Sequence, residues 1–246
     1  MGLYHRDRDY GRLCPDCMDY YHRFVRRFGS SKCRDIIGLR FKVGYDVRRF
    51  FLKGIRCLTV VYTSIASVFD IIEKGNQRPA STRRYQISPP FDMQRFACAS
   101  VVLSQIGSQL KADFGSILKA ARGFSGGIAF QGDICGAFMG AVLALGSVYG
   151  TEPRRRQRCR IFKAGLVTMK EGSRAFQREH LHPSFKTSLR VGRLYKQFVS
   201  TFGSADCMDI LGSVSSSQGP DGCEKMPQTT AQLALDFMDV PFEAAQ

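Results

Sequence analysis

The sequence lacks tryptophan, an apolar amino-terminal stretch and a balance of charge, since 36 Lys and Arg stand against 21 Asp and Glu. Its first residues, through Asp9, are charged and have no apolar core of the kind found in secretory signals. Arg6 also stands where a myristoylation site requires Ser or Thr. We therefore expect a cytoplasmic protein whose nine cysteines are reduced and act as ligands or redox thiols, not as a disulfide framework.

Strand-like alternation of apolar and polar residues is scarce, and long apolar runs are few. The longest uncharged run lies between Asp133 and Glu152, close to the lower limit for crossing a bilayer. Because this run is short and no second span accompanies it, we expect a buried core helix and no membrane span.

Several catalytic patterns are also missing. No Ser-His-Asp or paired-carboxylate constellation indicates hydrolysis. Gly123–Gly127 follows no strand and lacks the Gly-Lys-Ser/Thr ending of a phosphate-binding loop. Cys14 and Cys17 are followed by Met18 instead of His, so covalently attached heme c is not expected.

What the chain does contain is an internal repeat with a constant offset of 174 residues, 195 minus 21. Ten identities in register make chance a poor explanation. The first copy consists of Tyr21, Phe24, Val25, Phe28, Gly29, Ser30, Cys33, Asp35, Ile36 and Gly38. The second consists of Tyr195, Phe198, Val199, Phe202, Gly203, Ser204, Cys207, Asp209, Ile210 and Gly212.

Each copy continues through a variable loop to Cys57 or Cys223 and then to a segment with helical spacing. We therefore predict three parts: a half-unit at 1–76, an exposed linker at 77–90 and a complete four-cysteine module at 91–246. The half-unit alone is too small to bury its apolar helix, Leu58 to Ile72, so packing against the complete unit or a second subunit is expected and a homodimer is favoured.

The predicted fold is all-α, a helical bundle with a partial amino-terminal duplication of its carboxyl-terminal half. In the complete module we expect one helix over Phe91–Leu110 with Asp92 as its cap and a second around Phe114–Arg122. A third, apolar helix should be capped by Asp133 and end at Gly150.

Cysteines follow helix-start signals in this module. Cys135, Cys207 and Cys223 each fall in a predicted first turn, where unpaired N–H groups favour a thiolate over a thiol. A free cysteine is otherwise often just a small buried hydrophobic residue. The repeated placement favours a functional set, and we predict that these three converge with Cys98 on one site.

The same residues carry a family resemblance. Phe96–Ala99, Gly123–Gly127, the Cys-Gly-Ala-x-x-Gly block within Gly132–Ala141, Phe202–Gly212 and finally Cys223 resemble the redox-active protein family named for its C, GCAxxG, C, C pattern. The match runs from about Arg95 to the carboxyl end, and the half-repeat at Tyr21 to Ile72 is similar to the second half alone.

The resemblance implies a site in which Cys98, Cys135, Cys207 and Cys223 act as redox thiols or as metal ligands. A related module lies beside the hemes of split-Soret cytochromes, which implies an iron–sulfur cluster or other metal centre as the cofactor. Four glycines of the motif would let backbone approach such a centre or a neighbouring helix: Gly126, Gly127, Gly132 and Gly136.

A weaker second metal set, Cys14, Cys17, Cys33 and Cys57, is available in the first region.

The sequence thus predicts a cysteine-based protein that transfers electrons or cycles between thiol and disulfide. If the protein is an enzyme, we expect an oxidoreductase. Its redox partner is not specified by the sequence. The alternative is a basic non-enzymatic module that binds nucleic acid or another acidic partner through runs such as Arg154–Arg160 and has structural cysteines. No known nucleic-acid motif accompanies these runs, so nucleic acid is not the favoured partner.

Overall fold

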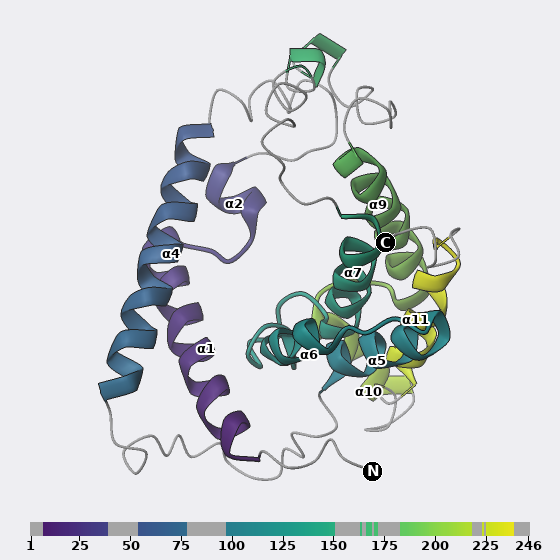
Figure 1. Cartoon of the computed structure of the whole chain (residues 1–246), viewed down its shortest axis with the longest axis horizontal. Coiled ribbons are helices and arrows are strands. Elements are labelled where there is room, and N and C mark those ends of the chain that lie inside the picture. The colour runs from purple at the N-terminus through teal and green to yellow at the C-terminus, as the bar shows by residue number, and fades with distance from the viewer. Residues whose placement is uncertain are drawn as a thin grey trace. The chain divides into compact units, whose positions relative to one another are not determined.

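The computed structural model describes residues 7–38, 54–77, 97–150, 163, 166–168, 170–171, 183–217, 223 and 225–238. These residues form nine α-helices and one short 3-10 helix, so the predicted all-α fold is confirmed (Figure 1). The chain divides into two compact units, Met1–Asp92 and Met93–Gln246. Within the described residues, no helix is both long and apolar enough to cross a membrane.

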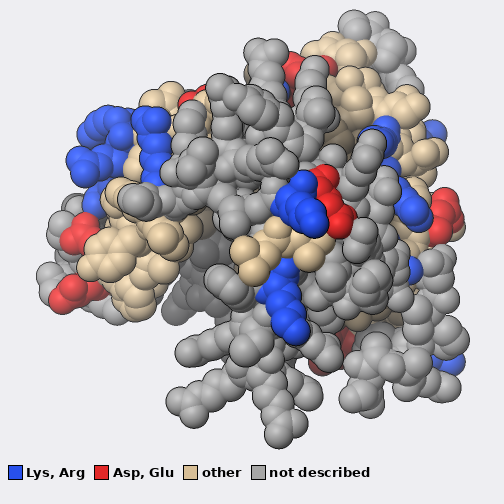
Figure 2. Space-filling view, turned by 90° about the horizontal axis from the view of Figure 1, so that it is seen from above, with Lys and Arg blue, Asp and Glu red and all other residues tan. Residues whose placement is uncertain are grey.

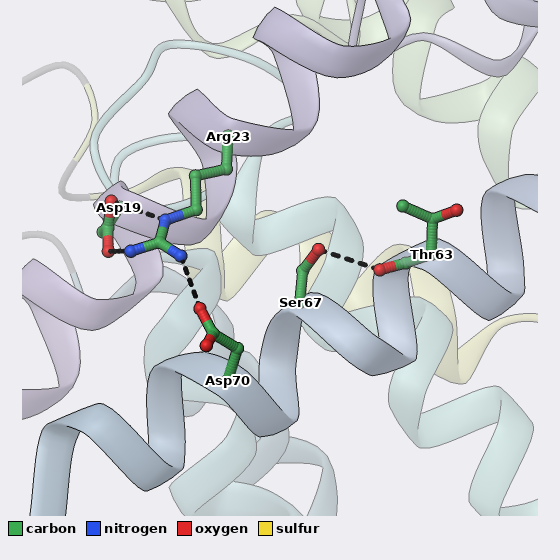
Figure 3. A network of polar contacts seen from close by, with 5 residues as sticks. All are labelled: Asp19, Arg23, Thr63, Ser67 and Asp70. Carbon is green, nitrogen blue, oxygen red and sulfur yellow. Dashed lines mark hydrogen bonds and ion pairs between the residues drawn. The ribbon is translucent and has the colours of Figure 1, made fainter.

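The first unit contains α1 (Asp7–Phe28), α2 (Cys33–Ile37) and α4 (Gly54–Gln77). Its small core is made of Ile36 and Ile37 with Phe24, Phe28, Cys57 and Val60 packed against them. Arg23 of α1 joins the two long helices, because its guanidinium lies 2.8 Å from Asp70 of α4 (Figure 3). The same guanidinium lies 2.7 Å from Asp19 of its own helix. All three side chains are more than a third exposed, so these ion pairs contribute little to stability.

The second unit is a helical bundle around α7 (Gly136–Tyr149), which contacts α5 (Cys98–Leu110), α9 (Pro183–Phe202) and α11 (Met226–Leu235). The shorter helices α6 (Gly115–Ala121) and α10 (Cys207–Ser217) complete the described part of this unit. Its core is apolar and includes Val102, Leu103, Ile106, Leu145, Leu194 and Phe198, all fully buried. The uncharged run at Asp133–Glu152 is therefore the buried core helix that its composition predicts, and it ends at Gly150 as expected.

The backbones of α5 and α7 come unusually close at Gly140. A Cβ on this glycine would lie 2.5 Å from the carbonyl oxygen and 2.8 Å from the Cα of Ala99. Glycine is required here because no side chain fits between the helices. The contact holds the amino-terminal turns of α5 and α7, and thus Cys98 and Cys135, beside each other.

Local structure repeats with the sequence repeat. Gly29 and Gly203 both have φ of +80°, and each is followed by a serine. The Oγ of Ser30 donates to Asp35 at 3.0 Å, and the Oγ of Ser204 donates to Asp209 at 2.9 Å. α2 then begins at Cys33 and α10 at Cys207. The two segments thus adopt the same turn and helix start, whereas the duplication of an entire half-unit remains a prediction.

Three predicted helix starts in the second unit are wrong. α5 begins at Cys98, directly after non-helical Ala97, and not at Phe91. The cap of α7 is Cys135 instead of Asp133, because the backbone of Asp133 is engaged in hydrogen bonds with another segment. Cys223 lies in a turn before α11, which starts at Met226. The predicted cap Asp92 and the linker after Gln77 lie outside the described residues.

Candidate functional site

Two cysteine-bearing segments are joined by backbone hydrogen bonds just before their helices begin. The N–H of Cys135 donates to the carbonyl of Ala205 at 2.7 Å, and the N–H of Cys207 donates to the carbonyl of Asp133 at 2.6 Å. Between them, Ile134 and Asp206 form an isolated antiparallel bridge. Because side chains alternate along extended backbone, those of Cys135 and Cys207 lie on one face of the bridge and those of Ile134 and Asp206 on the other.

All four predicted site cysteines of the second unit lie near one another. Cys98 is the first residue of α5 and Cys207 the first of α10, while Cys135 caps α7 and Cys223 precedes α11. Each thiol is close enough to the other three for their charges to interact. Cys135 and Cys207 are buried, whereas Cys98 and Cys223 are partly exposed. The four sulfurs thus share one partly accessible site.

The glycines predicted to lie at the site bring its parts together. A Cβ on Gly127 would lie 2.7 Å from the Cβ of Cys207, and one on Gly136 would lie 3.5 Å from the Cβ of Cys98 and 2.5 Å from the carbonyl oxygen of Phe124. Similarly, Cβ atoms on Gly126 and Gly132 would collide with Phe130 and Met208. The protein's own atoms account for the need for glycine at all four positions, and a role in cofactor binding stays a prediction.

A left-handed turn supports this arrangement. Five consecutive residues, Gly126 through Phe130, have φ between +51° and +74°. Three of them are not glycine, and the left-handed conformation costs such residues about 1–2 kcal/mol each. Hydrogen bonds compensate, because Gly132 and Asp133 donate to the carbonyls of Gly126 and Gly127 at 3.0 and 3.1 Å. This strained turn leads directly into the backbone bridge that joins Cys135 to Cys207.

Burial determines the protonation of these thiols. Desolvation is the larger cause and the nearby thiols are the smaller one, and together they raise the pKa of Cys98 and of Cys207 to about 12. The same two causes raise the pKa of Cys223. At Cys135 burial raises the pKa, although the N–H groups of Phe138 and Ala137 favour the thiolate. The expectation that helix starts produce thiolates is therefore wrong for this site without a bound cation, because desolvation outweighs the helix N–H groups.

Sequence reasoning missed a sulfur contact at the site. The thiol of Cys135 donates to Sδ of Met226, the first residue of α11, at 3.6 Å in the buried core. The helical spacing of the segment after Cys223 gives no information about which helix start Met226 would meet. This contact joins α11 to the start of α7.

Four cysteine sulfurs are the donors that thiophilic metals and iron–sulfur clusters prefer, so the donor chemistry of the site fits such a centre. The thiols would have to lose their protons and draw closer to bind it. In the described part of the chain, no three His, Cys, Asp or Glu residues are already positioned to hold a metal ion.

The weaker second set is only partly visible. Cys33 and Cys57 are close enough for the charge of Cys57 to contribute to the raised pKa of Cys33, whose larger cause is burial. Cys17 lies on α1 and is partly exposed, and the side chain of Cys14 lies outside the described residues. A metal role for Cys14, Cys17, Cys33 and Cys57 stays a prediction.

The strongest basic run, Arg154–Arg160, also falls outside the described residues. On the face shown in Figure 2, the Lys and Arg side chains of the described residues form several separate groups, some beside Asp or Glu. The alternative of an acidic partner therefore stays a prediction.

Comparison with known proteins places the thiol site within one family. No curated protein and no solved structure matches the chain. The family described as "Putative redox-active protein (C_GCAxxG_C_C)" matches residues 96–237, a range that contains Cys98, Cys135, Cys207 and Cys223. Because this match covers more than half of the sequence, the chain belongs to the C_GCAxxG_C_C family of redox-active proteins.

Proposed function

We propose that Cys98, Cys135, Cys207 and Cys223 are the working thiols of a redox protein, which cycle between dithiol and disulfide or hold an iron–sulfur or other metal centre for electron transfer. The observation that supports this proposal is the mutual proximity of all four thiols, three of them at helix starts and Cys223 in the turn before α11. A set of unrelated structural cysteines has no reason to gather in this way.

In the dithiol reaction, a site thiol loses its proton and attacks a disulfide of the redox partner, forming a mixed disulfide. A second site thiol then attacks the first, and the partner leaves as a dithiol that has gained two electrons and the two protons lost by the site. Cys98 and Cys223 are the entry points because they are partly exposed, whereas Cys135 and Cys207 are buried. Exclusion of water from Cys135 and Cys207 would protect the resulting disulfide from side reactions.

A bound metal centre would instead supply one-electron transfer, with the same four cysteines as its ligands. Positive charge at the site would offset the desolvation that keeps the thiols protonated. The N–H groups of Ala137 and Phe138, which already favour the thiolate of Cys135, would assist this change.

Anaerobic purification of the full chain tests the proposal and separates its two forms. Iron with acid-labile sulfide, or stoichiometric zinc, supports a metal centre, and the loss of free thiols in pairs upon treatment with oxidised glutathione supports the dithiol form. A colourless, metal-free protein whose four site thiols stay reduced over a range of glutathione potentials would contradict both. Salt-sensitive binding of nucleic acid by such an inert protein would favour the basic-module alternative.

A further inference from the structure

The first unit has an apolar stripe along α4 that its own helices leave exposed. The stripe consists of Leu58, Val61, Tyr62, Ile65, Val68, Phe69 and Ile72. Exposure reaches 70% at Leu58, 78% at Tyr62 and 67% at Phe69. The spacing of three and four residues puts all seven on one face of the helix.

The other face of α4 is the one that packs within the unit. Asp70 reaches Arg23 of α1, and Ser67 on the same side donates to the carbonyl of Thr63 at 2.8 Å (Figure 3). Cys57 and Val60 contact the small core around α2. The side of α4 that bears Val60, Ser67 and Asp70 thus faces its neighbours, and the apolar stripe faces outward.

The second unit shows what covers the corresponding helix. There α11 follows the repeated turn and α10, as α4 follows the matching turn and α2. α11 buries Thr230, Ala231 and Ala234 in a bundle with α5 and α7. Among the described residues of the first unit, no helices correspond to α5 and α7.

The size and chemistry of the stripe suit a second copy of the same helix pair. Its seven apolar side chains are each between 39% and 78% exposed, and they can supply much of the roughly 800 Å² that each partner contributes to an interface of standard size. No charged residue occurs between Arg56 and Asp70, which disfavours an acidic or basic partner. A second copy of α4 brings an apolar, uncharged stripe of the same length.

We propose that two copies of this chain associate through α4, with the two stripes packed antiparallel about Ile65. This centre places Leu58 of one copy opposite Ile72 of its partner and buries the whole length of both stripes. The helix macrodipoles of the two α4 helices then oppose each other, which favours this antiparallel pairing. The interface is isologous, as expected for a two-fold homodimer.

Light scattering and sedimentation of the reduced full chain test the proposal with two adjacent substitutions. Wild type should have twice its 27.5 kDa mass at micromolar concentration. Ile65→Asp should weaken dimerisation at least 100-fold, because a charge would be buried at the centre of the interface. Ala66→Asp is the matched control, since Ala66 is exposed on the same helix but lies outside the stripe, and it should remain dimeric.

Circular dichroism should show the same helix content for both variants, since neither position is buried within the unit. A wild-type monomer would overturn the proposal, and slow amide exchange along α4 in that monomer would show that the chain covers its own stripe. Two other results would also contradict it: an Ile65→Asp variant that dimerises like wild type, or an Ala66→Asp variant that dissociates equally.

Discussion

Ile134 pairs with Asp206 across an antiparallel bridge, although 72 residues, 206 minus 134, separate them in the sequence. The pairing fixes the register between two segments that each place a cysteine one residue later, Cys135 and Cys207. Helix packing alone would hold these cysteines only as precisely as side chains pack. Backbone hydrogen bonds between them define their separation more tightly, which suits a site where sulfurs must meet.

Gly127→Ala should disrupt this bridge. The new Cβ would lie 2.7 Å from the backbone N and O of Asp133, at a φ of +74°. We expect a loss of about 3 kcal/mol in the free energy of unfolding, from both overpacking and the left-handed conformation. Gly203→Ala is the control, because its φ is +80° but nothing lies within 4 Å, so only about 1 kcal/mol should be lost. Equal losses in urea unfolding would show that the contact with Asp133 is unimportant.

Gly140 and Gly146 allow a comparison within one helix, α7. Gly140→Ala would press against the backbone of Ala99, so we expect a loss of about 1–3 kcal/mol in unfolding free energy. Gly146→Ala meets nothing within 4 Å and should stabilise the protein by up to about 1 kcal/mol through helix propensity. A stabilising Gly140→Ala variant would contradict the close approach of α5 and α7.

The repeated serine turn predicts a similar cost at two distant places. Ser30 and Ser204 each accept a hydrogen bond from an N–H two residues on, at 3.0 and 3.1 Å, and each donates to an aspartate. Replacing either serine by Ala should cost about 1 kcal/mol. Hydrogen exchange can measure the loss separately at α2 and α10. A cost at only one site would argue that the two turns have different structural roles.

The sequence was sufficient to predict the all-α class, the buried helix ending at Gly150 and the helix start at Cys207, because each follows from local periodicity or capping. It was insufficient where distant segments compete for backbone groups. Asp133 has the composition of a helix cap, but its carbonyl accepts from Cys207 and its N–H donates to Gly127. The protonation of the thiols was also missed, since burial depends on tertiary packing that no local pattern encodes.

High pH should destabilise the reduced, metal-free protein. In the unfolded chain a cysteine ionises near pH 9, whereas burial raises the pKa of Cys98 and Cys207 to about 12 in the folded state. Their contribution to stability is therefore fully present below about pH 9 and is lost as pH rises from about 9 to about 12, because the unfolded state releases protons first.

Urea unfolding at several values between pH 8 and pH 11 measures this slope. Cys98→Ala should unfold more easily at pH 8 but should lose less stability than wild type as the pH rises, by on the order of 2 kcal/mol. Lys and Tyr also titrate in this range, and the comparison between variant and wild type removes their effect. Parallel slopes would mean that the Cys98 thiol ionises as readily in the folded chain as in the unfolded one.

Cys135→Ser should remove redox function while preserving the fold. The serine oxygen can accept the N–H groups that favour the Cys135 thiolate, so the cap of α7 is retained and the stability cost should stay near 1–2 kcal/mol. Serine cannot form a disulfide and is a poor ligand for soft metals, because its hydroxyl stays protonated. We expect the electron equivalents exchanged with a glutathione buffer to fall by at least half, or the bound metal to be lost.

Cys159→Ser, outside the four-thiol set, should behave as wild type. Full redox capacity in Cys135→Ser, with circular dichroism unchanged, would remove Cys135 from the site and leave the backbone bridge to Cys207 without a redox role.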